Sequence, residues 1–360
     1  MATNRHPSPR WPTALPGVAW LAVVLLATAC GEEPELEPSA PDTDPSAIDS
    51  QEASPAEGQA IYERSLVFVS GPQPQGASAE ADSTVVIPWS FRSLTVEDLD
   101  IRERGVWLGG VDGWEALAME ADTGQVSPAS LGPPWRIVPG RRVRIVVAPG
   151  DALEALILRW DGSELEARPG AVLSEWTRSP REAVRIHRGS AILPSDAPSG
   201  VPSGIVEGFL ADLALPLGSE TAPEADWVFV HGGDGLQAVL VERPDPAQEG
   251  VHAFRAWFRI GEEEVAWEEV GVRWNEVRAY EPARRDVPAR WSLHLDASDP
   301  DDEDAPPRLA GYLEAVSSHL TTGPGDGPLL PVQGFFRLRG ELVLGGDTTA
   351  VTGIARHRQP

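Results

Sequence analysis

The sequence predicts an all-β protein of two consecutive antiparallel barrels or strongly curved sheets, which follow a signal peptide and a disordered tether. Two observations support this fold class. From Tyr62 onward, apolar and polar residues alternate with a period of two, and helical periodicity is hard to find. The chain also contains 35 glycines and 35 prolines, many of which separate the alternating runs at short intervals, as in sandwiches and barrels.

The first 29 residues have the organisation of a secretory signal peptide. Arg5 and Arg10 precede the apolar run GVAWLAVVLLATA, which is too short to cross a membrane as a helix. Cys30, the single cysteine of the chain, directly follows the run. The stretch LLATAC resembles the bacterial lipobox, in which a peptidase cuts before a cysteine that carries acyl chains such as palmitate. The resemblance implies that Cys30 is lipidated.

An alternative interpretation of the same stretch stays open. Ala27-Thr28-Ala29 is also an A-x-A site for ordinary signal peptidase, which would cut the same bond. That cleavage would leave a free thiol at the N-terminus in an oxidising compartment. Gly31 follows the cysteine and resembles the outer-membrane pattern of lipoproteins. We therefore expect an outer-membrane lipoprotein that faces the periplasm or the cell surface.

Residues 30–60 are expected to form a disordered tether. The segment that follows Cys30 contains nine acidic residues, no basic residue and regularly spaced prolines. Such a composition cannot bury enough apolar surface to form a core. Two β domains are expected after the tether, at residues 61–217 and 224–358. The polar, proline-containing stretch LGSETAPEADW marks the boundary between them.

Strand faces can be assigned from the alternation. In the first domain, Val143, Ile145 and Val147 fall on one face of a strand. In the second, Trp291, Leu293 and Leu295 share a face, and so do Phe254, Phe258 and Ile260. The expected hairpin turns contain Asp161-Gly162, Gly232 to Gly235, Gly261 and Gly345-Gly346. Roughly eight strands are expected in each half, the number in a small closed barrel.

Composition excludes several classes of function. The net charge of −26 comes from 29 basic and 55 acidic residues, so nucleic acid is not an expected partner. All the basic residues are arginine. A single cysteine forms no intrachain disulfide and no cysteine-rich zinc site. The histidines lack metal-ligand spacing, so neither a metal nor another cofactor is expected. The acidic run from Asp296 to Asp304 is interpreted as a solvated loop rather than a calcium site.

From about residue 204 onward, several short motifs resemble one family. They are VEGFLAD with Gly208 and Asp212, DWVFVHGGDGLQAVLVE, ARWSLHLD and GFFRLRGELVLGGDTTAVTGIA. The family is the tandem lipocalin-like (calycin) group that includes hydroxyneurosporene synthase (carotenoid 1,2-hydratase) and AttH-like proteins. The resemblance implies two lipocalin-like barrels. It also implies that a carboxylic acid near Asp212 protonates an isoprenoid double bond, although LALP replaces the residues that usually follow this acid.

The candidate site residues are few. Asp212 is the candidate catalytic acid, and the alternative places it at a solvent-facing strand end. Trp227, Phe229 and His231, which the alternation places on one face of a strand, are candidates for ligand binding, and so is Trp291. For His231, the alternative is a hairpin-end residue bonded to backbone; for the tryptophans, it is core packing. There is no phosphate-binding glycine loop and no G-x-S-x-G motif.

Three functions remain in consideration. The leading one is a lipid-anchored binding protein that holds an apolar, lipid-like or isoprenoid-like ligand in or between the barrels, without catalysis. The second is a hydratase or lyase that acts on an isoprenoid or lipid through Asp212. The third is a structural or interaction protein of the cell surface whose barrels are filled by side chains. The sequence names no protein partner.

Overall fold

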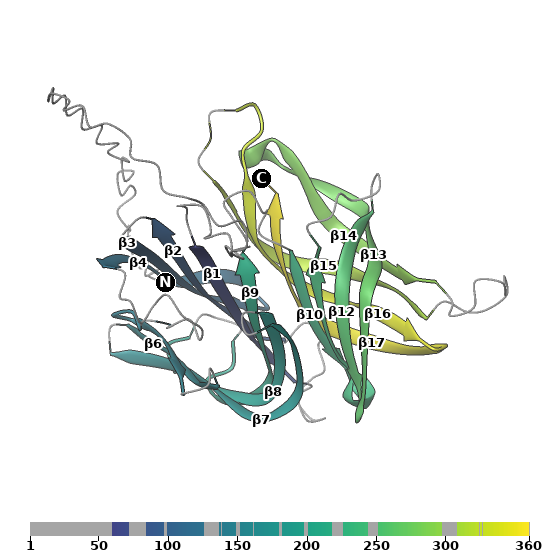
Figure 1. The fold of residues 1–360 in the computed structure, drawn as a ribbon, viewed down its shortest axis with the longest axis horizontal. Helices are drawn as coiled ribbons and strands as arrows, with labels where there is room; N and C mark the ends of the chain where they lie inside the picture. The colour runs from purple at the N-terminus through teal and green to yellow at the C-terminus, as the bar shows by residue number, and fades with distance from the viewer. Residues whose placement is uncertain are drawn as a thin grey trace, which may run out of the picture. The chain divides into compact units, whose positions relative to one another are not determined.

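The computed structural model describes residues 60–71, 84–96, 99–125, 137, 139–148, 152–160, 162–179, 182–197, 201–217, 226–243, 251–296, 308–323, 325 and 327–359. These residues belong to one compact unit, and they contain no α-helix. The predicted signal peptide, Cys30, the tether before Ala60, the boundary residues 218–225 and most of the acidic run from Asp296 to Asp304 lie outside them. The all-β fold class is confirmed (Figure 1).

The first sheet contains nine antiparallel strands. They are β1 (Ala60–Ser70), β2 (Val86–Val96), β3 (Leu99–Gly110), β4 (Gly113–Gln125), β5 (Val143–Val147), β6 (Leu153–Trp160), β7 (Ser163–Ser179), β8 (Glu182–Leu193) and β9 (Gly204–Leu217). Their order is β4-β3-β2-β1-β9-β8-β7-β6-β5. The chain therefore forms a meander whose first strand pairs with its last, and the two edges are β4 and β5.

A side chain bridges the two edges of the first sheet. Glu120, on β4, accepts hydrogen bonds from the backbone N–H groups of Arg142, at 2.6 Å, and Val143, at 3.2 Å. Position 140, next to this carboxylate, requires glycine, because a Cβ atom on Gly140 would lie 2.2 Å from the Glu120 carboxylate. The Glu120 carboxylate thus takes the place of a backbone ladder between β4 and the start of β5.

The second sheet is a closed antiparallel barrel of eight strands in sequence order. They are β10 (Trp227–Gly232), β11 (Gln237–Glu242), β12 (His252–Ile260), β13 (Glu263–Tyr280), β14 (Arg285–Leu295), β15 (Leu309–Thr322), β16 (Val332–Leu344) and β17 (Asp347–Gln359). Closure comes from pairing of β10 with β17, in a register that sets Trp227 opposite Arg356. An up-and-down barrel of eight strands is the lipocalin-like architecture.

The predicted hairpin turns are confirmed where the structure describes them. β6 and β7 are joined at Trp160 and Ser163, which pair across a two-residue turn. In the β16–β17 hairpin, Leu344 pairs with Asp347. The intervening Gly345 and Gly346 have φ values of 57° and 98°. Glycine is suited to this turn because both central residues adopt positive φ.

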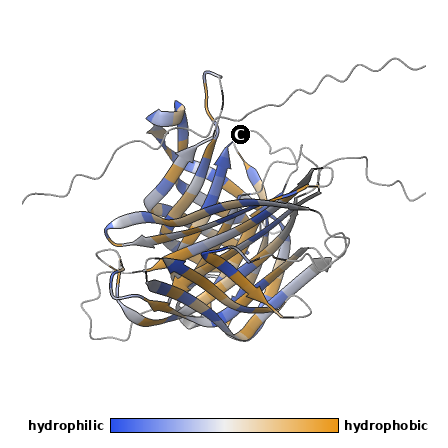
Figure 2. Cartoon of the chain, turned by 90° about the vertical axis from the view of Figure 1, so that its left-hand side faces the viewer, coloured by the Kyte–Doolittle hydropathy of each residue, from blue (hydrophilic) through white to orange (hydrophobic). Residues whose placement is uncertain are grey.

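The alternation places one apolar set inside each sheet, as Figure 2 shows by the alternating colours along the strands. In the first sheet, Val143 and Ile145 are buried with Leu66, Phe68 and Trp89. In the second, the buried residues inside the barrel include the following: Phe254, Phe258, Trp291, Leu293 and Phe336. The predicted core faces of these strands are confirmed, except at Ile260, which is 36% exposed at the end of β12.

A third apolar core lies between the two sheets. Val67 and Val69 of β1 pack there with Ala211 of β9, against Phe229 and Ile354 of the barrel. The strands of the two sheets accordingly lie side by side in Figure 1.

Polar contacts flank this core. Glu63 of β1 forms an ion pair with Arg356 of β17, and both side chains are buried. At the other end of β1, the Ser70 carbonyl oxygen lies 2.9 Å from His231 Nε2. The two sheets therefore share a continuous buried interface.

Candidate ligand site in the second barrel

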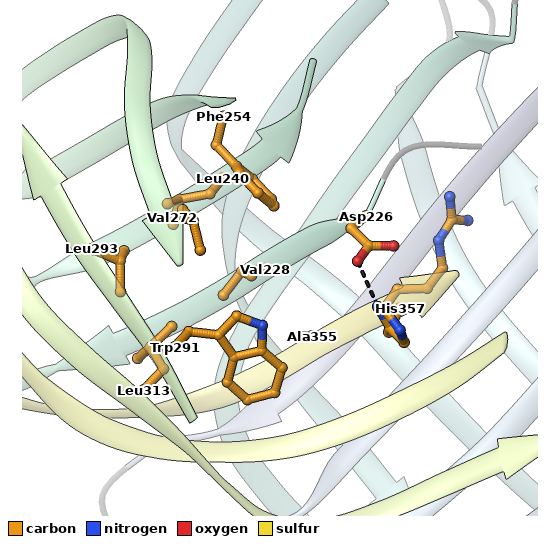
Figure 3. Close-up of a pocket in the computed structure, with 11 residues that line it drawn as sticks. Asp226, Val228, Leu240, Phe254, Val272, Trp291, Leu293, Leu313, Ala355 and His357 are labelled. Carbon is orange, nitrogen blue, oxygen red and sulfur yellow. Dashed lines mark hydrogen bonds and ion pairs between the residues drawn. The ribbon is translucent and has the colours of Figure 1, made fainter. Parts of the chain in front are cut away.

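The second barrel contains a small internal cavity with a volume of about 20 Å³. A cavity of this size holds about one water molecule. Most of its lining is apolar and comes from seven strands: Val228, Leu240, Phe254, Val272, Trp291, Leu293, Leu313 and Ala355. The polar lining residues are Asp226, Arg356 and His357. Figure 3 shows Asp226 and His357 together on one side of the apolar set. The cavity is thus apolar with one polar end.

The polar end is formed where the barrel closes. Asp226 directly precedes β10, and His357 lies near the end of β17. His357 Nδ1 lies 2.7 Å from Asp226 Oδ2, and the backbone N–H of Arg358 donates to Asp226 Oδ1 at 2.6 Å. Burial raises the pKa of the Asp226 carboxyl above its usual range, and His357 opposes this effect. The carboxyl therefore fixes both the ring and the backbone of β17.

The second ring nitrogen of His357 has no partner. His357 is 2% exposed, and its Nε2 atom is buried without a hydrogen bond. The ring lies against Trp274 and Phe336, with centroid distances of 5.4 and 5.9 Å. A carboxyl that holds one nitrogen orients the ring and leaves the other nitrogen to a ligand or a proton. This is the arrangement that an acid–base or hydrogen-bonding site requires.

A second histidine–carboxylate pair adjoins the first. His252 Nδ1 lies 2.9 Å from Glu242 Oε1, and this hydrogen bond raises the pKa of His252. The other Glu242 oxygen accepts the backbone N–H of Asp226 at 3.2 Å. The Trp274 ring stacks on His252 at 5.0 Å. Trp274 therefore contacts both histidines, and the two pairs form one polar rim, which comprises Asp226, Glu242, His252 and His357.

Asp212, the predicted catalytic acid, occupies a different place. It is 1% exposed, so its alternative placement at a solvent-facing strand end is wrong. Arg64 of β1 donates to both carboxylate oxygens, through Nε at 2.8 Å and Nη2 at 2.6 Å. Arg185 Nη1 lies 3.9 Å away. A two-point contact of this kind fixes the carboxylate and ties β1 to β9. The catalytic role of Asp212 stays a prediction.

Further charges surround this pair inside the first sheet. Arg104 is 1% exposed, lies 2.5 Å from Asp122 and places its guanidinium 5.5 Å from the centre of the Phe91 ring. Arg102 lies 2.8 Å from Asp100. His187 is buried nearby, and burial lowers its pKa. The first sheet therefore contains further ion pairs on β3 and β4, in one of which Asp122 is 45% exposed.

The predicted ligand-binding residues divide into two places. Trp227, Phe229 and His231 share one face of β10, as predicted, and this face packs on the first sheet. His231 is bonded to backbone, at Ser70, which is the alternative that the sequence left open for it. Trp291 lines the cavity. The role of these residues in ligand binding stays a prediction.

Sequence reasoning missed Asp226, Glu242, His252 and His357. Asp226 and His357 are 131 positions apart and meet only because β10 pairs with β17. Within the described ranges, no group of three or more histidine, cysteine, aspartate or glutamate side chains is arranged to hold a metal ion. None of the helical segments in those ranges has the length and apolar character of a membrane span.

Comparisons with known proteins concern the fold alone. No family model and no curated protein matches the sequence. A solved AttH-like protein from Nitrosomonas europaea is 9% identical, with a TM-score of 0.49, and the match covers 88% of this chain and 98% of that one. CghA with Sch210972 is 12% identical, with a TM-score of 0.47, over 82% and 88% of the two chains. CghA alone is also 12% identical, with a TM-score of 0.45, over 82% and 87%.

Proposed function

We propose that this protein is a lipid-anchored binding protein of the bacterial cell envelope that holds a small apolar ligand in its second barrel. The observation that supports this proposal is the apolar cavity inside a closed barrel, with polar groups at one end. Ligand sites in barrels are typically apolar and contain a small number of polar groups that fix orientation. The anchor is proposed to be Cys30, in the outer membrane, with the folded part facing the periplasm or the cell surface.

The cavity volume constrains the proposed ligand. At about 20 Å³, the cavity as it stands accepts one water-sized group. A larger ligand requires lining side chains such as Phe254 and Leu240 to change rotamer. We therefore expect one small molecule or the end of one acyl or isoprenoid chain, rather than a bulky lipid.

Ligand binding is tested by blocking the cavity. Ala355 lines it, and Ala355→Val adds two carbon atoms there. The matched control is Ala279→Val, on the exposed part of β13, where the added atoms meet solvent. Native mass spectrometry of full-length protein should detect a co-purified apolar molecule with the wild type and the control. We expect at least a tenfold lower occupancy with Ala355→Val.

The same measurement separates the rival functions. The close packing of both interiors supports a structural or interaction role, which predicts no bound molecule and equal behaviour of the two variants. A hydratase or lyase that uses Asp212 has less support, because Arg64 holds that carboxylate in an ion pair. If all three proteins lack a ligand after extraction from native membranes, the structural role replaces our proposal.

The anchor has its own test. Cys30→Ser removes the atom that would carry the acyl chains, and each lost methylene contact weakens membrane binding by about 0.8 kcal/mol. We expect the variant in the soluble periplasmic fraction and the wild type in the membrane fraction after a high-salt wash. Sedimentation of the Ser variant with membranes would contradict lipidation at Cys30, whatever the outcome for the cavity.

A further inference from the structure

We infer that His357, held in place by Asp226, is the group that recognises the polar head of the ligand, and that the second barrel selects an uncharged amphiphile with a hydroxyl head. This inference rests on the proposed function. It assigns a role to a buried histidine and names the chemical class of the ligand.

The ring is fixed before any ligand arrives. Asp226 holds Nδ1 at 2.7 Å, and Asp226 is itself held by the backbone N–H of Arg358. Trp274 contacts the ring edge-on, and Phe336 packs against it from inside the barrel. A ring restrained on three sides loses little further freedom when a ligand binds, which favours affinity.

The free nitrogen is a vacant hydrogen-bonding position. His357 Nε2 is buried and has no partner, and the residue lines the cavity. A buried polar atom without a partner is costly, and a ligand that satisfies it recovers that cost. An apolar molecule without a head group would leave the nitrogen unsatisfied. A head group that forms a hydrogen bond is therefore preferred.

The surrounding charges select an uncharged head. The Asp226 carboxyl lines this end, and Glu242, which accepts the backbone N–H of Asp226, lies behind it. Arg356, although part of the lining, forms its ion pair with Glu63 of the first sheet. A carboxylate head would meet the Asp226 carboxyl, and like charges at short distance repel each other. A hydroxyl group can both donate and accept, so it satisfies Nε2 in either protonation state of the ring.

Asp226 and His357 also have a structural explanation, in which they only tie the end of β17 to the start of β10. That role needs Nδ1 and the Asp226 oxygens but does not involve Nε2. The two explanations therefore differ in one respect. Only recognition makes the affinity for a hydroxyl compound depend on His357 more than the affinity for a matched hydrocarbon does.

The experiment uses three six-carbon probes, 1-hexanol, n-hexane and hexanoate, with the full chain. Binding is followed by the fluorescence of the tryptophans that line or adjoin the cavity and by ¹⁵N NMR of the histidine rings. We expect the wild type to bind hexanol about tenfold more tightly than hexane or hexanoate, as for one added hydrogen bond. In His357→Phe, hexanol should lose this tenfold preference, while the affinity for hexane stays within twofold. His294→Phe, on an exposed face of β14, is the matched control.

The outcomes distinguish the two proposals. Equal binding of hexanol and hexane to the wild type overturns this inference and leaves the proposed function standing. Tightest binding of hexanoate overturns it in the same way. If none of the probes binds, the proposed function fails and the inference fails with it. If His357→Phe does not fold, the NMR measurement on the wild type tests the inference by itself. The His357 Nε2 resonance must then shift with hexanol and stay unchanged with hexane.

Discussion

The interiors of the two sheets handle charge in opposite ways. The first sheet buries one complete ion pair, between Arg64 and Asp212, and it also buries Arg104, whose partner Asp122 is 45% exposed. The second barrel has an apolar interior, and the charged groups that line its cavity lie at one end. The first sheet is also held at its edges by a side chain, whereas the second closes through a backbone ladder.

The difference indicates a division of roles. A buried ion pair uses its hydrogen-bonding capacity on its partner, so the Arg64–Asp212 pair is committed to holding β1 and β9 together. His187 of the same sheet is also buried, and neither of its ring nitrogens has a hydrogen bond. In the second barrel, one buried nitrogen is left over at the edge of a cavity. This contrast supports our proposal that the second barrel, rather than the first sheet, is the ligand site. Each prediction below tests one side of this contrast.

The largest effect is expected from breaking the Arg64–Asp212 pair. Arg64→Met leaves a buried carboxylate without its main partner, which costs about 3–5 kcal/mol in the free energy of unfolding. The double variant with Asp212→Leu replaces both charges by apolar groups and should recover at least half of the loss. Urea unfolding followed by tryptophan fluorescence measures both. A double variant as unstable as Arg64→Met would show that the ion pair is not the cause.

A smaller effect is expected from His231, which lies between the two sheets. Burial lowers the pKa of His231 to about 4 from its ordinary value of 6.5. Above pH 6.5 the histidine is neutral in both the folded and the unfolded chain, so it adds no pH dependence to the free energy of unfolding. As the pH falls from 6.5 to 4, the unfolded chain takes up a proton that the folded chain refuses, so stability is lost. The loss from this residue is about 3 kcal/mol by pH 4.

His231→Gln isolates this contribution, since glutamine does not titrate and its amide can still donate to the Ser70 carbonyl oxygen. The unfolding free energy of the wild type should fall more steeply between pH 6.5 and 4 than that of the variant. Parallel curves would mean that water reaches His231 at the interface.

The smallest effect is expected at the edges of the first sheet. Glu120→Gln removes one of the two acceptor oxygens that hold the N–H groups of Arg142 and Val143, at a cost of about 1 kcal/mol. Hydrogen exchange of these two amides should become faster, while the β10–β17 amides of the second barrel stay unchanged. If hydrogen exchange became faster to the same extent in both sheets, the proposed difference between the first sheet, bridged by Glu120, and the closed second barrel would be wrong.

Strands and hairpins could be predicted because they depend on neighbours in sequence. The alternation predicted the inner face of β14, and the two glycines predicted the turn between β16 and β17. The alternation also placed Trp227, Phe229 and His231 on one face of β10. It could not say whether that face points into the barrel or toward the other sheet, because both environments are apolar.

The site could not be predicted because it depends on register across the closure. Asp226 and His357 become neighbours only when Trp227 is set opposite Arg356. Asp212 posed a similar problem. Its apolar surroundings in the sequence fitted burial, but its partner, Arg64, is 148 positions away. Long-range charge pairs of this kind leave no periodic pattern in a single sequence.

The interface ion pair has a consequence for how the protein is displayed. Glu63 lies three residues after the start of β1, and it pairs with Arg356, next to His357 and close to the end of β17. The polar rim therefore lies close to the start of β1 and to the end of β17, on the same side of the described fold. A fluorescent protein fused after residue 360 would crowd that side, whereas an epitope inserted at Gly345-Gly346 would point away from it.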